Sequence, residues 1–152
     1  MFSATRWRKW RATPAVMRRY LVEAAFELLR ARLVVAWTLK RSLPALLEPT
    51  TGILDERTVR YVRYIVALAA NAVPWSSVCL PNAIAARRML ARRGIGSTMH
   101  LGVGFHEGQA LHAHAWLEAD GIIVTGENGT GDVTRLPITE QDAMGPTKWG
   151  TR

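Results

Sequence analysis

Hydrophobic side chains recur every three or four residues through the first two thirds of the chain, which is the spacing of one helix face. The first such segment spans residues 13–40, with Thr13 and Pro14 as a helix-start signal and Pro44 as a stop signal. Residues 42–52 contain two prolines and a glycine and are predicted to form a connection. The apolar stripe of this first helix comprises Met17, Leu21, Ala24, Leu28 and Val35.

A second helix is predicted over residues 56–72 and ends at the Val73-Pro74-Trp75 break. Three arginines, Arg57, Arg60 and Arg63, are predicted to face outward. The predicted inward positions are Val59, Tyr61, Val62, Ile65, Val66 and Leu68. The short link to the next segment suggests that the second and third helices pack together.

The third helix carries Cys79, the single cysteine of the chain, and is predicted to end near residue 93, before Gly94. Proline is tolerated only near the first turn of a helix, so Pro81 requires Cys79 to lie at the helix N-terminus. Ser76 and Ser77 are the candidate N-caps. The predicted buried side comprises Leu80, Ile84, Met89 and Leu90, and the predicted solvent side comprises Arg87, Arg88, Arg92 and Arg93.

After Gly94 the hydrophobic pattern changes to an alternation with a period of two, which is typical of strands. Residues 97–105, 111–118 and 122–125 are predicted strands, joined by turns at residues 106–110 and 119–121. Loops and one short strand are predicted beyond Gly126. The pattern predicts an α+β fold in which an antiparallel meander packs on helices. One face of the first strand carries Met99, Leu101, Val103 and Phe105.

The chain of 152 residues is 49% hydrophobic, which is enough for one globular core. We expect residues 1–50 to form a basic tail and a long amphipathic helix, and residues 51–152 to form the main domain. A single cysteine leaves a free thiol and favours a reducing compartment, so we expect a cytoplasmic protein. No apolar run has the length of a secretory signal or a membrane span.

The net charge of +8 is concentrated in residues 1–50, which hold ten lysines and arginines against three glutamates. Nucleic-acid binding is one interpretation of such a basic segment, but no motif with a known docking mode accompanies it. Contact of Trp7 and Trp10 with a membrane surface is another, and a loosely ordered tail is the simpler one. We expect neither nucleic-acid binding nor stable membrane insertion.

Cys79 is the candidate nucleophile, because unpaired N–H groups and the positive end of the macrodipole at a helix start favour a thiolate. A lone cysteine is more often an inert core residue. The strand at residues 111–118 changes this balance, because it places His112, His114, Trp116 and Glu118 on one face. A cysteine that begins a helix and a histidine on a later strand form the arrangement of papain-like and transglutaminase-like enzymes.

His114 is favoured over His112 as the base because it lies nearer the middle of the strand and two residues from Trp116. Zinc is the rival use of cysteine and histidine, but no short-spaced ligand pair accompanies the two histidines. We therefore expect no metal and no cofactor.

The group that would orient His114 depends on the turn. Asp120 lies in the turn itself, roughly 20 Å from His114 at about 3.3 Å per residue. A three-residue turn places Gly126 opposite His114, with Glu127 and Asn128 as the nearest substitutes. A two-residue turn places Glu127 directly opposite His114, and this register makes Glu127 the candidate third member.

Residues 74–80, 86–95, 101–103 and 113–121 resemble the leader peptidases of lasso-peptide biosynthesis, which are small transglutaminase-like cysteine proteases. The block around Cys79 and the His114-Ala115-Trp116 block carry most of the resemblance, which covers roughly residues 55–130. The helical N-terminal third is similar to the family's split form. The resemblance implies a transglutaminase-like or papain-like core, with Cys79 as nucleophile and His114 as general base. The family's third residue, an aspartate twelve positions after the histidine, corresponds here to Gly126.

The resemblance also implies a substrate and partners. The substrate would be a ribosomally made precursor peptide, cut after its leader, commonly beside a threonine at the leader's penultimate position. The partners would be a small leader-recognition protein and an ATP-dependent lasso-peptide cyclase. The apolar N-terminal helix and its basic residues are the hypothetical docking surface for these partners.

Three other functions remain open from the sequence. A non-hydrolytic acyltransferase would use the same thioester intermediate. A catalytically impaired scaffold that binds a partner in peptide maturation is suggested by Gly126 at the family's aspartate position. A nucleic-acid-binding helical protein would show binding that falls steeply with salt.

Overall fold

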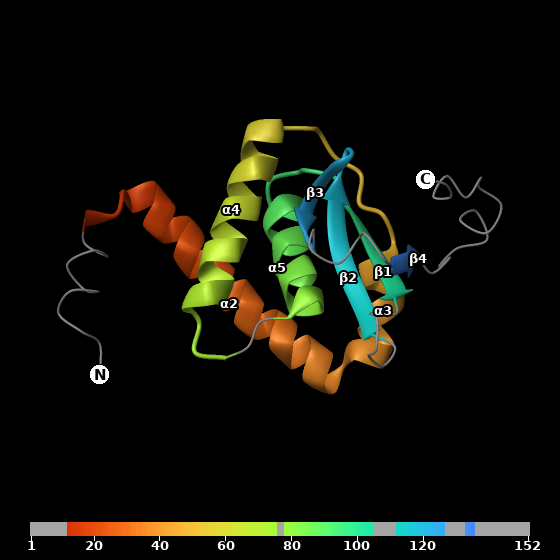
Figure 1. Cartoon of the computed structure of the whole chain (residues 1–152). Helices are drawn as coiled ribbons and strands as arrows, with labels where there is room; N and C mark the ends of the chain where they lie inside the picture. Colours follow the sequence, from red (N-terminus) through yellow and green to blue (C-terminus); the bar gives the residue numbers. More distant parts are fainter. Residues whose placement is uncertain (1–11, 76–77, 105–111, 127–132, 136–152) are drawn as a thin grey trace.

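A computed structural model describes residues 12–75, 78–104, 112–126 and 133–135 (Figure 1). The described helices precede the described strands along the chain, which confirms the predicted α+β class. The helices are α2 (Ala15–Trp37), α3 (Leu39–Leu47), α4 (Glu56–Ala72) and α5 (Cys79–Ala91). The strands are β1 (Thr98–Gly104), β2 (His112–Ala119), β3 (Ile122–Thr125) and β4 (Val133–Arg135).

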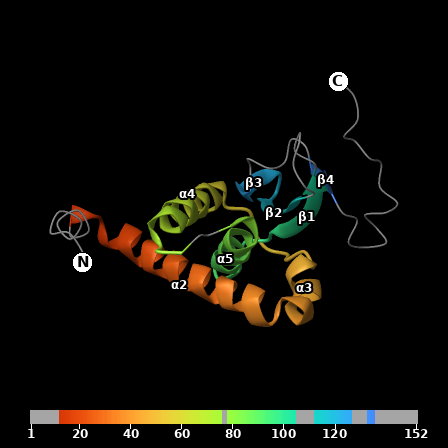
Figure 2. The same cartoon turned by 60° about the horizontal axis from the view of Figure 1, so that its bottom comes forward.

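Helix α5 is the centre of the fold. It lies between the sheet on one side and α2 with α4 on the other, and it contacts all three (Figure 2). Most of its side chains are therefore buried, including Ile84, Met89 and Leu90. The predicted packing of the second helix on the cysteine helix is confirmed.

One hydrophobic core joins the N-terminal helix to the rest of the fold. Ala24, Leu28 and Ala31 of α2 belong to the same buried cluster as α4, α5 and the inner face of the sheet. Helix α2 therefore contributes to the core of the fold as well as to its surface. Helix α4 adds Val59, Val62, Ile65, Val66 and Ala69 to this cluster, and the sheet adds Met99, Leu117, Ala119 and Val124.

The sheet has the strand order β3-β2-β1-β4 with antiparallel pairing throughout, so the predicted three-strand meander is confirmed and β4 returns to pair with β1. A two-residue turn joins β2 to β3, because Ala119 pairs with Ile122. Asp120 and Gly121 adopt φ values of 48° and 80°, as this tight hairpin turn requires.

A β-bulge follows this turn. Glu118 pairs with Ile123 but Leu117 pairs with Thr125, so Val124 is an extra residue in β3. A two-residue turn without a bulge would place Glu127 opposite His114. The bulge shifts β3 by one residue relative to that register, and the turn alone could not reveal this.

The predicted single helix over residues 13–40 is wrong at its C-terminal end. Helix α2 ends at Trp37, and α3 occupies residues that were expected to form a connection. Pro44 lies inside α3 and is tolerated because its position is exposed, where the lost hydrogen bond can be replaced by water. At the start, Pro14 is the N-cap and no side chain caps α2, so the predicted Thr13 cap is also wrong.

The predicted solvent side of the cysteine helix is correct for Arg92, which is exposed, but wrong for Arg87. Arg87 is buried and donates hydrogen bonds to the carbonyl oxygens of Leu46 and, at 3.2 Å, of Ala45 in α3. Arg88, Arg92 and Arg93 pair with the carboxylates of Glu23 and Glu27 on α2. Partners more than 40 residues away in sequence therefore hold all four arginines, and of these Arg87 is buried.

Helix α4 matches its predicted bounds, with Asp55 as the N-cap that accepts from the Thr58 N–H. Two of its side chains differ from the prediction. Leu68 is exposed and Ala69 takes the inward position. Arg63, expected to face outward, donates to the Ile123 carbonyl at 3.0 Å and so ties α4 to β3.

No helix in the part of the chain that the structure describes is both long enough and apolar enough to cross a bilayer.

Candidate active site

Cys79 is the first residue of α5, as the sequence predicts. Pro81 lies in the first turn, where its missing N–H breaks no helical hydrogen bond. The N-cap is Val78, so the expectation that Ser76 or Ser77 occupies this position is wrong; both serines lie outside the described residues. The Cys79 thiol is half-buried and lies at the positive end of the helix macrodipole.

His114 lies in β2 and is half-buried. The Trp116 side chain, two residues further along, stacks on the imidazole with a centroid separation of 6.1 Å and an interplanar angle of 18°. Trp116 is itself buried, so it forms a fixed wall for the ring. The stacking agrees with the predicted placement of His114 and Trp116 on one face of the strand.

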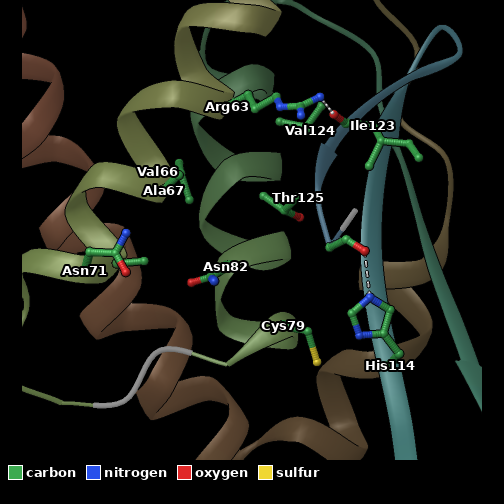
Figure 3. Close-up of a pocket in the computed structure, with 12 residues that line it drawn as sticks. Arg63, Val66, Ala67, Asn71, Cys79, Asn82, His114, Ile123, Val124 and Thr125 are labelled. Carbon is green, nitrogen blue, oxygen red and sulfur yellow. Dashed lines mark hydrogen bonds between the residues drawn. The ribbon is translucent and has the colours of Figure 1, made fainter. Parts of the chain in front are cut away.

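The structure brings Cys79 and His114 to the same pocket, which has a volume of about 400 Å³. Figure 3 shows the thiol of Cys79 and the imidazole of His114 on facing sides of its lower end. The pocket lies between α4, the start of α5 and the end of β3. Its other lining residues are Arg63, Val66, Ala67, Ala70, Asn71, Asn82, Ile123, Val124, Thr125 and Gly126.

Among the described residues, a hydrogen bond from the main chain fixes the orientation of the imidazole. His114 Nε2 lies 2.8 Å from the carbonyl oxygen of Gly126. A carbonyl oxygen only accepts, so Nε2 carries the proton and donates. In the neutral ring the other nitrogen, Nδ1, is then an acceptor, and Figure 3 shows it on the side of the ring where Cys79 lies.

Gly126 occupies a position where a side chain does not fit. Its φ is +85°, and a Cβ there would lie 2.7 Å from both the Ala115 carbonyl oxygen and the Trp116 Cβ. This close approach follows the β-bulge and brings the backbone of residue 126 against β2. The backbone at residue 126 therefore has no room for a carboxylate side chain.

The remaining candidate residues lie away from the contact between His114 and Gly126 or outside the described residues. Glu127 and Asn128 lie outside the described residues, so Glu127 as a third member stays a prediction. Asp120 is an exposed turn residue and lines a different hollow, beside Thr98 and Glu118. His112 pairs with Gly104 at the start of β2.

Four polar residues of the pocket were not predicted: Arg63, Asn71, Asn82 and Thr125. Asn82 could have been found from the sequence, because it follows Cys79 by three residues and so shares its helix face. Arg63, Asn71 and Thr125 come from elements whose relative placement the sequence pattern does not give.

The described residues contain no cluster of three His, Cys, Asp or Glu side chains that could hold a metal ion. What the pocket does combine is a thiol at a helix start, an oriented imidazole and amide side chains. This set suits nucleophilic attack on a carbonyl carbon.

A family model described as the transglutaminase-like superfamily matches residues 20–137, which is more than half of the chain. The chain belongs to the transglutaminase-like superfamily. This family is consistent with the α+β fold and with a cysteine at the start of a helix that packs on an antiparallel sheet. No curated protein and no solved structure matches the chain.

Proposed function

We propose that this transglutaminase-like protein is a cysteine peptidase with Cys79 as nucleophile and His114 as general base. The observation that carries the proposal is the shared pocket, in which the thiol faces an imidazole whose Nε2–H is held by the Gly126 carbonyl. This leaves Nδ1 on the side of Cys79, where a proton acceptor is needed.

The reaction has two halves. The Cys79 proton passes to His114 Nδ1, and the sulfur attacks the peptide carbonyl carbon to form a tetrahedral intermediate. His114 returns this proton to the leaving nitrogen, the C–N bond breaks, and an amine and a Cys79 thioester result. Water then loses a proton to His114 and attacks the thioester. The C–S bond breaks, a carboxylic acid is released, and the leaving sulfur takes the proton back from His114, which restores the thiol and the neutral imidazole.

The developing oxyanion needs hydrogen-bond donors. The backbone N–H of Cys79 belongs to the first turn of α5, where N–H groups have no partner within the helix. The macrodipole at the same place also favours negative charge. We therefore assign the Cys79 N–H as one oxyanion donor.

The substrate we propose is the leader segment of a ribosomally made lasso-peptide precursor, processed in the cytoplasm. Support comes from the resemblance of the Cys79 block and of the His114-Ala115-Trp116 block to that group of peptidases. The pocket is a cleft at the molecular surface, which suits a peptide segment. A separate leader-recognition protein would present the precursor, and a cyclase would use the released core peptide.

Helix α2 offers a docking surface for such a partner. Five large apolar side chains on its outer face are exposed, and at about 100° per residue they fall within an arc of roughly 80°. They form a stripe about 22 Å long, opposite the face that enters the core. We call this stripe the outer α2 stripe. It comprises Val22, Phe26, Leu29, Leu33 and Trp37.

The charged side chains around the outer α2 stripe indicate which protein surface it would bind. Arg19, Arg30 and Arg32 are exposed beside it. The two carboxylates of α2, Glu23 and Glu27, are paired with arginines of α5, and Glu27 also with Arg30. The surface is thus apolar with a cationic rim. It fits a protein surface that presents apolar side chains flanked by Asp and Glu.

Two other occupants fit this surface less well. A second copy of the chain would bring two arginine rims together, which is unfavourable. A membrane is a flat partner, but the N-terminal end of the outer α2 stripe is hollow. The hollow has a volume of about 610 Å³, and its lining includes Arg18, Arg19, Val22, Glu23 and Phe26. A hollow receives an inserted side chain better than a flat headgroup layer.

The test of the proposed activity is mass spectrometry of a precursor peptide encoded at a neighbouring locus. The peptide is incubated with the full chain and the leader-recognition protein, with Cys79→Ala in parallel. We expect cleavage at one site that is lost in the variant. Absence of cleavage with all components present would instead support the scaffold alternative, and capture of an added amine without hydrolysis would support an acyltransferase.

A further inference from the structure

The contact between His114 and Gly126 identifies the group that positions the base. We infer that the main-chain carbonyl of Gly126 is the third member of the site and replaces the carboxylate that the family places at this residue. The inference concerns the same site as the proposed peptidase and rests on that function only for its biological role.

The first support is the direction of the hydrogen bond. His114 Nε2 lies 2.8 Å from the Gly126 oxygen, which is a normal hydrogen-bond length. An orienting group must accept from the nitrogen remote from the nucleophile, and in Figure 3 the carbonyl lies at that nitrogen while Nδ1 lies on the Cys79 side. The carbonyl therefore selects the tautomer that the proton transfer needs.

The second support is the backbone that presents this oxygen. Gly126 has a φ of +85°, and its Cα is so close to β2 that a Cβ would meet Ala115 and Trp116 at 2.7 Å. This conformation is available to glycine and strained for other residues. A glycine at the family's aspartate position is thus explained by the site itself, because it lets the main chain approach the imidazole.

The third support is the second restraint on the ring. Trp116 stacks on His114 within 6.1 Å and is buried. The ring plane is therefore held by Trp116 and the rotation within that plane by Gly126. The base is oriented without a carboxylate.

A carbonyl differs from a carboxylate in a way that can be measured. It carries no net charge and does not titrate, so it orients the neutral imidazole but stabilises the imidazolium less than an anion does. We expect the thiolate–imidazolium form of this site to depend on the acceptor strength of the Gly126 oxygen. That strength can be lowered without any change of side chain at residue 126.

The experiment replaces the peptide bond after Gly126 by an ester, which weakens the Gly126 oxygen as an acceptor. Lactic acid is incorporated at position 127 of the full chain, and the reference is Glu127→Ala, which has the same side chain and a normal peptide bond. Glycolic acid at position 121 is the matched control, because it weakens the Asp120 carbonyl in the exposed turn instead. The readout is the rate of Cys79 alkylation by iodoacetamide as a function of pH.

We expect the ester at position 127 to slow alkylation at neutral pH about fivefold to tenfold relative to Glu127→Ala, the factor for one weakened hydrogen bond. The ester at position 121 is expected to leave the rate unchanged. A loss of more than about a hundredfold in Glu127→Ala, with no further effect of the ester, would overturn the inference and assign the role to Glu127.

A spectroscopic measurement makes the same test without any nucleophile. Imidazole ¹⁵N spectra of the full Cys79→Ala chain, with His114 assigned by His114→Gln, report which nitrogen carries the proton. We expect the neutral ring to hold its proton on Nε2, and a proton on Nδ1 or averaging between the two would overturn the inference. Neither measurement needs a peptide substrate, so both remain informative if the precursor is not cleaved.

Discussion

Arg93 Nη2 lies 2.6 Å from Glu23 Oε2, and this ion pair joins the C-terminal end of the cysteine-bearing helix α5 to α2. Only about a fifth of either side chain is exposed. Arg93 also lies 4.3 Å above the Tyr20 ring. The helix that carries Cys79 is thus held at the end opposite the thiol by charged groups of the N-terminal helix.

The first prediction concerns the pH dependence of this ion pair. Hydrogen bonding by Arg93 and then Arg92 lowers the pKa of the Glu23 carboxyl below its usual 4.5, although burial opposes the shift. Stabilisation by Glu23 is therefore complete above about pH 4.5 and is lost as the pH falls through the folded-state pKa. We expect Glu23→Gln to lower the free energy of unfolding by about 1–3 kcal/mol at pH 7 and by progressively less in acid.

Urea unfolding of both proteins from about pH 7 to about pH 3 measures this difference. Glu56→Gln is the matched control, because Glu56 pairs with Arg60 on the surface with both side chains more than half exposed. That variant is expected to change stability by less than about 0.5 kcal/mol at any pH. A pH-independent effect of Glu23→Gln would contradict the prediction.

The second prediction concerns Arg87, whose buried guanidinium donates to the carbonyls of Ala45 and Leu46 at the end of α3. Burial lowers the pKa of Arg87, and Glu48 partly opposes this. Arg87→Leu would leave both carbonyls without this donor, at a cost of about 2–4 kcal/mol in unfolding free energy. We expect Arg87→Lys to recover part of the loss, because one ammonium can reach one of the two carbonyls. An unchanged denaturation midpoint in Arg87→Leu would show that α3 does not depend on this contact.

The third prediction concerns restoring an acidic residue at Gly126. Gly126→Asp is expected to lose alkylation rate and at least about 2 kcal/mol of stability, because the φ of +85° and the contacts at 2.7 Å exclude a Cβ. Gly94→Ala separates backbone strain from steric contact. Gly94 has a φ of +69°, but a Cβ there would have nothing within 4 Å, so only the strain applies. Its cost should be about 1 kcal/mol, with the reactivity of Cys79 unchanged. A more active Gly126→Asp enzyme would show that β3 can rearrange to accept a carboxylate.

The fourth prediction concerns the reacting groups. Cys79→Ser and His114→Gln are each expected to reduce precursor cleavage by about a thousandfold or more, because both act in one proton-transfer unit. The double variant should cleave the precursor no more slowly than the less active of the two single variants. Cleavage followed by mass spectrometry measures this, with circular dichroism as the check on folding. Additive losses would indicate that the two side chains act independently.

The fifth prediction concerns the outer α2 stripe. Phe26→Glu and Leu33→Glu replace exposed apolar groups beside exposed arginines, so the unfolding temperature should change little. Binding of the leader-recognition protein should weaken by about tenfold or more. Precursor cleavage should fall when the concentration of that protein is limiting and should recover when it is present in excess. Tyr64→Glu, at an exposed site on α4, is the control. Normal binding by both stripe variants would place the docking surface elsewhere, and a purified dimer or binding to anionic vesicles would identify a different occupant.

The sequence predicted most of the element types, because the hydrophobic periodicity is strong in the helices and in the meander. Helix α4 matches its expected range, and Pro81 placed Cys79 at the start of α5. Pro44 misled the prediction, because it lies inside a further helix, α3, instead of following the end of the first one. The burial of Arg87 and the pairing of Arg92 could not be predicted, since their partners lie on α2 and α3.

For the site, local sequence identified the two groups that lie on regular elements. Cys79 and His114 were found from a helix start and a strand alternation, and the structure places both on one pocket. The orienting group could not be found in this way, for two reasons. It is a main-chain oxygen, which has no residue-type signal, and its position depends on the bulge at Val124, which the turn sequence does not encode.

The two faces of α2 have different neighbours, although they belong to one helix of 23 residues. Its inner face meets α5 and its outer face carries the exposed stripe. A saturation-mutagenesis scan of residues 15–37 should therefore divide into two classes that alternate with a period of about 3.6 residues. Substitutions at inner positions would lower the steady-state amount of protein. Substitutions at outer positions would leave that amount unchanged and would reduce only the proposed peptide maturation in cells.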